Sequence, residues 1–350
     1  MLLYIIYTTK GNDMLYSRSN ETILKELDQV VYGHKAAKMA LITLVNRSKM
    51  RYHQIWHAET PVAQDDLVKN VNCLLIGNSG TGKTHLVQSL SKICDFPLVC
   101  IDANQLAPTN ASDGFSVDRL IKTLKKEASR LVEEKPEIYF SKDGALDQMV
   151  VFIDEVDKLA KAFDSTGSWN QHVQAGFLSL FENTTELANL SFIFAGAFDK
   201  MTLSKESNKR SIGFKTEVHE VNNEFDLEQE VIKYGLLPEL VGRIHNIVPL
   251  DKLEKADYKK ILRTLILPNM RKELKHFNCP NFTLSVKEEE DIINKAVKSK
   301  MGVRILRKEV LKLAQEIEFD YEWEVVAPKP KPKSRIFEAE LKDLIANKKD

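Results

Sequence analysis

Residues 77–84 read GNSGTGKT, and this octapeptide limits the chain to a small group of folds. It satisfies the phosphate-binding pattern GxxxxGK[ST], in which glycines let backbone amides turn toward phosphate oxygens. The mostly apolar residues 71–76 precede it and residues 84–94 show helical spacing, so we expect the loop between a strand and a helix N-terminus. Lys83 is expected to reach the β and γ phosphates, and the Thr84 hydroxyl to bind Mg²⁺. The residues expected to contact the nucleotide here are Gly77, Asn78, Ser79, Gly80, Thr81, Gly82, Lys83, Thr84 and His85.

A second apolar segment ends in two carboxylates. Residues 149–153 read MVVFI and are followed by Asp154 and Glu155. At the end of a strand beside the glycine-rich loop, Asp154 is expected to hold Mg²⁺ and Glu155 to polarise the attacking water. Neighbouring carboxylates also suit a solvated loop. Together with residues 77–84, however, they predict an ATP-hydrolysing site.

Short apolar runs alternate with helical segments over much of the chain, which is typical of a parallel sheet buried on both faces. We therefore predict an α/β fold, with a P-loop domain whose parallel sheet is flanked by helices, followed by a smaller, mostly helical C-terminal domain. In that second domain, residues 255–276 and 286–321 are predicted to be helical, around one short strand at 282–284. The predicted divisions are a leader at 1–19, a large α/β domain at 20–248, a small helical domain at 249–326, and a Pro/Lys linker with a tail helix at 327–350.

The composition argues against several classes of function. The chain has 50 basic and 50 acidic side chains, and a formal net charge of zero argues against binding nucleic acid through bulk charge. Its four cysteines form no CxxC pair, so we expect no zinc site and no disulfide framework. Reduced thiols fit a cytoplasmic protein. No apolar stretch approaches about 18 residues, so we expect no membrane-spanning segment.

Several separate motifs resemble the AAA+ ATPases and, among them, the ClpX protein unfoldases. The resemblance extends from about residue 27 to 321. Residues 30–38 are similar to the segment that lines the adenine pocket in ClpX, and residues 152–158 (FIDEVDK) to its extended Walker B motif. Residues 235–243 (GLLPELVGR) are similar to the box that ends in the arginine finger, and residues 301–307 (MGVRILR) to the sensor-2 motif of the small domain.

The resemblance implies an ATPase that uses ATP and Mg²⁺ and assembles as a homohexamer. Val31 and Tyr32 would lie at the adenine. Arg243 would reach the γ-phosphate bound by a neighbouring subunit, and Arg304 would contact the same phosphate from the small domain of its own subunit. Outside these motifs, either arginine would be read as part of a surface salt bridge. The catalytic residues expected from the motifs and the resemblance are Lys83, Glu155, Arg243 and Arg304.

Two loops bear on the partners. Ile212, Gly213 and Phe214 match the tripeptide with which ClpX-like ATPases dock onto the ClpP peptidase, and they lie in a charged stretch where exposed apolar side chains are best explained by a partner. A loop folded back on its own domain is the alternative. Phe115 falls where ClpX carries an aromatic pore loop that grips protein substrates, although a buried core position also suits it.

The chain also departs from ClpX. It contains no N-terminal zinc domain with four cysteines, and no basic Arg-Lys-His loop between Glu155 and Phe192. The sensor-1 strand, residues 192–198, has no Asn or Thr at its end. The leading interpretation is a hexameric unfoldase that threads substrate proteins into a ClpP-type peptidase. The alternatives are an AAA+ remodelling factor that acts without a protease, and a ClpP-binding regulator or decoy.

Overall fold

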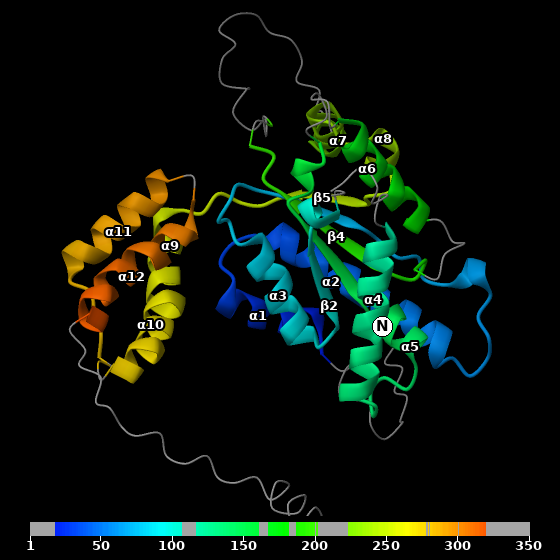
Figure 1. The fold of residues 1–350 in the computed structure, drawn as a ribbon, viewed down its shortest axis with the longest axis horizontal. Helices are drawn as coiled ribbons and strands as arrows, with labels where there is room; N and C mark the ends of the chain where they lie inside the picture. The colour runs from blue at the N-terminus through cyan, green and yellow to red at the C-terminus, as the bar shows by residue number, and fades with distance from the viewer. Residues whose placement is uncertain are drawn as a thin grey trace, which may run out of the picture.

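The computed structural model describes residues 18–106, 117–160, 167–181, 187–199, 201, 223–277, 279, 281–299 and 301–319. Figure 1 shows a sheet covered by helices and, beside it, a separate group of C-terminal helices coloured yellow to red. Most of the predicted leader, and all of the predicted linker and tail at 327–350, lie outside the described residues.

Five strands form one sheet in the order β2-β3-β4-β1-β5, and all neighbouring pairs are parallel. The α/β fold with a parallel sheet flanked by helices is therefore confirmed. Because every strand runs the same way, the loops that follow the strands gather at one edge of the sheet, where α/β proteins bind their ligands. The strands are β1 (Cys73–Ile76), β2 (Leu98–Asp102), β3 (Val150–Asp154), β4 (Ser191–Gly196) and β5 (Asn246–Pro249).

Helices cover both faces of this sheet and also form the C-terminal group. The longer helices of the sheet domain are α1 (Asn20–Val30), α2 (Lys35–Trp56), α3 (Lys83–Cys94), α4 (Val117–Glu134), α6 (Gly167–Phe181) and α7 (Asn223–Tyr234), and the short ones are α5 (Lys142–Asp147) and α8 (Pro238–Val241). The C-terminal group contains α9 (Lys255–Ile261), a π-helical turn (Leu262–Ile266), α10 (Leu267–Leu274), α11 (Val286–Lys298) and α12 (Val303–Phe319).

Alternate residues of the strands build two separate cores, as the pleat of a strand requires. On one face, Phe192 and Phe194 of β4 pack with Phe177 of α6, whose ring meets both edge to face. On the other face, Ile193 and Ala195 pack with residues of α1, α2 and α3. The sheet is thus fixed from both sides, which holds the strand ends in register at the edge that carries the motifs.

The C-terminal helices enclose a third core of their own. The strand predicted at residues 282–284 is wrong, because no strand pairs with this segment in the described part of the chain. Instead, Phe282 is buried among the helices and its carbonyl accepts a hydrogen bond of 2.8 Å from Arg271 Nε. The helical stretch predicted at 286–321 is divided into α11, which ends at Lys298, and α12, which begins at Val303. Gly302, directly before α12, has a φ of 54°. This interruption places the motif at 301–307 at the start of α12.

None of the described helices has both the length and the apolar character needed to cross a membrane.

Candidate active site

The loop between β1 and α3 has the backbone conformation that its glycines predict. Gly80 and Gly82 have φ angles of 76° and 97°, a region that other residues enter only with strain. The amide of Gly77 donates to the carbonyl of Gly196 at 3.1 Å, which joins the loop to the end of β4. Because α3 begins at Lys83, directly after the loop, the free amides of its first turn lie next to the loop.

Lys83 is almost buried in this loop, with 9% of its surface exposed. Its ammonium donates hydrogen bonds to the carbonyls of Gly77 and Asn78, the second at 3.2 Å. Burial lowers the pKa of Lys83, and the nearby carboxylates of Asp154 and Asp157 oppose that shift. The loop therefore encloses a cation close to two acidic groups, one at the end of β3 and one shortly after it, an arrangement that suits the binding of a phosphate together with a metal ion.

The first turn of α3 touches the end of β3. Thr84 Oγ1 donates to Asp154 Oδ2 at 2.7 Å. Hydroxyl and carboxylate oxygens are the hard ligands that Mg²⁺ prefers, so this pair fits the ion predicted for it. No cluster of three or more His, Cys, Asp or Glu side chains suited to a metal occurs among the described residues.

Glu155 is held in an unusual conformation by its neighbours. Its φ of 58° is left-handed, which costs a residue with a side chain about 1–2 kcal/mol. Its amide donates to Asp154 Oδ1 at 2.9 Å, and its Oε2 accepts a hydrogen bond of 3.0 Å from Asn104 Nδ2. Asn104 lies two residues after the end of β2 and also donates twice to Asp102. Sequence reasoning missed Asn104, because only the pairing of β2 with β3 brings it to Glu155.

The end of β4 lacks the polar residue usual for a sensor, and a carboxylate from the segment after β3 contacts it. Asp157 is 3% exposed, and its Oδ1 accepts a hydrogen bond of 3.1 Å from the amide of Ala197. Gly196 makes room for this contact, since a Cβ there would lie 2.9 Å from the same oxygen. The segment after β3 and the end of β4 are therefore joined beside Lys83.

The start of α12 reaches the glycine-rich loop from the C-terminal domain. Arg304 Nη1 donates to Ser79 Oγ at 3.0 Å, and the amide of Val303 donates to the carbonyl of Gly80 at 3.1 Å. A Cβ at Gly80 would lie 2.0 Å from the carbonyl oxygen of Met301, so the two backbones are in direct contact. Arg304 therefore lies at the loop of its own subunit, as the resemblance implies, although its role in sensing phosphate stays a prediction.

These segments enclose a cleft of about 420 Å³, a volume within the usual range for small-molecule sites. The sequence predicted about half of its lining residues, and those not among the predicted site residues are Asp157, Lys158, Gly196, Ala197, Asp199, Ile266, Val303 and Arg307. The residues that line the cleft are Ser79, Gly80, Gly82, Lys83, Thr84, His85, Asp154, Glu155, Asp157, Lys158, Gly196, Ala197, Asp199, Ile266, Val303, Arg304 and Arg307.

The residues predicted for the adenine flank this cleft without lining it. Val31 is buried at the end of α1, and the Tyr32 hydroxyl lies 2.7 Å from Thr264 Oγ1 of the C-terminal domain. His34, which was not predicted as a site residue, is buried, and its Nε2 lies 2.9 Å from the carbonyl of Thr81 in the glycine-rich loop. The segment that begins with Val31 thus contacts both the C-terminal domain and the loop, and its role in adenine binding stays a prediction.

Arg243 lies away from the cleft of its own subunit. It is exposed just after α8, and the described residues offer its guanidinium no ion pair or side-chain hydrogen bond. Its carbonyl accepts a hydrogen bond of 3.0 Å from Asn72 Nδ2. This position suits a side chain that acts on another subunit, as predicted.

Two of the predicted loops lie outside the described residues: the pore loop with Phe115, and the peptidase docking loop with Ile212, Gly213 and Phe214. Their roles stay predictions.

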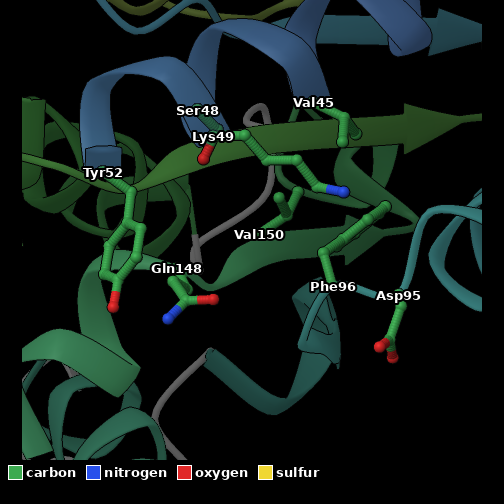
Figure 2. A pocket seen from close by; sticks show the side chains of 8 residues that line it. All are labelled: Val45, Ser48, Lys49, Tyr52, Asp95, Phe96, Gln148 and Val150. Atoms are coloured by element: carbon green, nitrogen blue, oxygen red, sulfur yellow. The ribbon is translucent and has the colours of Figure 1, made fainter. Parts of the chain in front are cut away.

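A separate small pocket lies between α2, the segment after α3, and β3. Figure 2 shows the Lys49 side chain extended across this pocket toward Phe96 and Asp95. Lys49 Nζ donates to the carbonyl of Cys94, the last residue of α3, at 2.5 Å, and burial lowers its pKa. Because a cation near the last carbonyls of a helix stabilises it, this pocket has a structural explanation.

Comparison with known proteins agrees with these motifs. A family model described as AAA domain (Cdc48 subfamily) matches residues 68–247. The chain is also similar to proteins named ATP-dependent Clp protease ATP-binding subunit ClpX. The one from Bacteroides thetaiotaomicron is 26% identical over an alignment of 331 residues, and the match covers 85% of this chain and 76% of that protein. The one from Treponema denticola is 27% identical over 340 residues, with the same two coverages. The predicted resemblance to ClpX ATPases is thereby confirmed.

Proposed function

The chain belongs to the AAA domain family and is an ATPase, and from this we propose that it is an ATP-driven protein unfoldase that acts in the cytoplasm as a homohexameric ring. The ring would thread substrate proteins into a ClpP-type peptidase. The relatives are named as ATP-binding subunits of an ATP-dependent Clp protease, which supports a peptidase partner.

One observation carries the proposal: the C-terminal domain closes directly on the phosphate-binding loop. Arg304 and Val303 contact Ser79 and Gly80, so a phosphate bound there would lie between two domains. Any change at the phosphate then changes a contact between domains, which is how a motor converts hydrolysis into movement. We infer that the large domain (20–248) and the small domain (249–326) are the two moving bodies.

The predicted catalytic and metal-binding residues would divide the chemistry among them. Lys83 would bind the β and γ phosphates, and Thr84 and Asp154 would hold Mg²⁺, which would neutralise phosphate charge. Glu155 orients the attacking water and accepts its proton. Arg243 projects to the nucleotide of the next subunit, and such an arginine finger is worth roughly 10³–10⁵ in rate. The active site would therefore be complete only at the interface between two subunits of a ring.

The test combines the ATPase with a ClpP-type peptidase and a folded fluorescent reporter. The parent should degrade the reporter only with both ATP and the peptidase. Replacing Ile212 and Phe214 with alanine should abolish degradation while ATP hydrolysis continues, because each apolar anchor contributes about 1.5–3 kcal/mol and six loops add through effective concentration.

If the parent unfolds the reporter but never stimulates a peptidase, the remodelling alternative replaces the proposal. If the parent binds the peptidase but unfolds no reporter, the regulator alternative replaces the proposal. A double variant that binds the peptidase as tightly as the parent would remove the docking assignment.

A further inference from the structure

Arg243 can act on a neighbouring subunit only if the segment that carries it is held in place. Its C-terminal side is fixed by Asn72, whose Nδ2 donates to the carbonyl of Arg243 at 3.0 Å and whose Oδ1 accepts from the amide of Phe192 at 3.0 Å. This anchors the segment to the sheet. Its N-terminal side, residues 235–237, has a different anchor.

That second anchor is Gln174 of α6, a side chain with no exposed surface. Its Oε1 accepts a hydrogen bond of 2.7 Å from the amide of Leu237, the residue before α8. Its Nε2 donates to the carbonyl of Leu159 at 2.9 Å and to that of Gly235 at 3.3 Å. Gln174 thus joins three segments, and its amide is fully paired, as a buried amide has to be.

The segment reached through Leu159 is the one that carries Glu155. Residues 156–158 form a turn of 3-10 helix directly after Glu155, and the amide of Leu159 closes that turn on the carbonyl of Val156 at 3.0 Å. The backbone of Gly235 also packs here, since a Cβ at Gly235 would lie 2.2 Å from the carbonyl oxygen of Ala160. The turn after the catalytic carboxylate and the start of the arginine segment are therefore in contact.

We propose that Gln174 is a positioning residue for Arg243, which ties the arginine segment to the turn after Glu155 and so sets where the arginine meets the next subunit. The inference rests on the proposed function, in which Arg243 acts across the interface. Gln174 touches neither nucleotide nor metal in this role. Its loss should therefore impair the neighbour's site and spare its own.

The first experiment compares Gln174→Met with Gln171→Met, a matched control at an exposed position of the same helix. Methionine keeps the length of the side chain and removes its hydrogen bonds. Gln174→Met should lower kcat for ATP by about 10- to 100-fold, since a displacement near 1 Å can cost about 100-fold. The KM for ATP should stay within about twofold of the parent. Gln171→Met should match the parent in both constants.

The second experiment mixes subunits, because a defect in Arg243 can be corrected by a neighbour. In rings that mix Gln174→Met with Glu155→Gln, the first subunit keeps an intact cleft and receives Arg243 from the second. Activity should therefore rise above that of either variant alone. A parallel mixture of Arg243→Ala with Glu155→Gln should behave in the same way and tests the premise.

The inference is overturned if Gln174→Met keeps the kcat of the parent, or if the Arg243→Ala mixture recovers activity and the Gln174→Met mixture does not, because Gln174 would then act on its own cleft. If neither mixture recovers, the trans action of Arg243 fails, and the inference fails with it. Should Gln174→Met not fold, Gln174→Glu replaces it, because a carboxylate still accepts from Leu237 but cannot donate to Leu159 and Gly235. The same recovery in mixed rings is expected.

Discussion

Replacing Gly80 with alanine should separate the C-terminal domain from the glycine-rich loop. The new Cβ would lie 2.0 Å from the carbonyl oxygen of Met301, and a backbone atom cannot swing aside as a flexible side chain can. Relief of the overlap has to break the hydrogen bond from Val303 to Gly80 and the one from Arg304 to Ser79. The contact between the two domains is then lost.

The magnitude follows from comparison with Gly82→Ala. Gly82 also has a positive φ, of 97°, but a Cβ there would meet nothing within 4 Å. Both variants incur the cost of a left-handed alanine, about 1–2 kcal/mol. Gly80→Ala alone also loses two hydrogen bonds, each worth about 0.5–1.5 kcal/mol. Its free energy of unfolding should therefore fall about 1–3 kcal/mol below that of Gly82→Ala.

The assay is urea unfolding of the full chain without nucleotide, followed by circular dichroism, together with hydrogen exchange of the Val303 amide. Exchange at this amide should be faster in Gly80→Ala and close to the parent in Gly82→Ala. Equal loss of stability in the two variants, with equal protection of Val303, would refute the reasoning.

Three further predictions each concern a single residue. Asn104→Ala should raise basal ATP hydrolysis by up to about tenfold. Asn104 holds the Glu155 side chain toward β2, which lies on the opposite side of β3 from β1 and the glycine-rich loop. An unchanged or lower rate would contradict this prediction. Burial lowers the pKa of His34 from its ordinary 6.5, so His34 is protonated more readily in the unfolded chain than in the folded one. The free energy of unfolding should therefore fall as pH drops below about 6.5. Urea unfolding measured from about pH 8 down to about pH 5 should show a smaller decline of the free energy of unfolding in His34→Gln than in the parent. An equal decline in the two proteins would contradict a contribution of His34 to this pH dependence. Phe115→Ala should slow degradation of a folded reporter without weakening peptidase binding, and a variant that degrades the reporter at the parental rate would remove Phe115 from the pore.

The local parts of the site could be predicted from sequence because their chemistry is set by short segments. The glycines that allow positive φ, the lysine that follows them, and the carboxylates after an apolar strand are all adjacent in the chain. Gly80 and Gly82 have positive φ, and Thr84 contacts Asp154, while the roles of these residues toward phosphate and Mg²⁺ stay predictions. In motifs of this kind, the local sequence determines the local backbone conformation.

Contacts between distant segments could not be predicted in the same way. Asn104 meets Glu155 only because β2 pairs with β3, and Gln174 meets Leu237 only because α6 packs on α8. Neither pairing leaves a periodic pattern in the sequence. The strand predicted at residues 282–284 does not form for a related reason. An apolar segment becomes a strand only where a partner strand pairs with it, and here Phe282 is buried among helices instead.

Whether the cleft binds and cleaves ATP as described is tested most directly by measuring nucleotide binding and hydrolysis side by side in the parent, Lys83→Ala and Glu155→Gln. Lys83→Ala should lose most of its affinity for ATP, because the cation inside the loop is gone. Glu155→Gln should bind ATP as the parent does and hydrolyse it at least 100-fold more slowly, because only the group that accepts the proton of water is removed. Hydrolysis by Glu155→Gln at the parental rate, with binding intact, would contradict the assignment of this cleft.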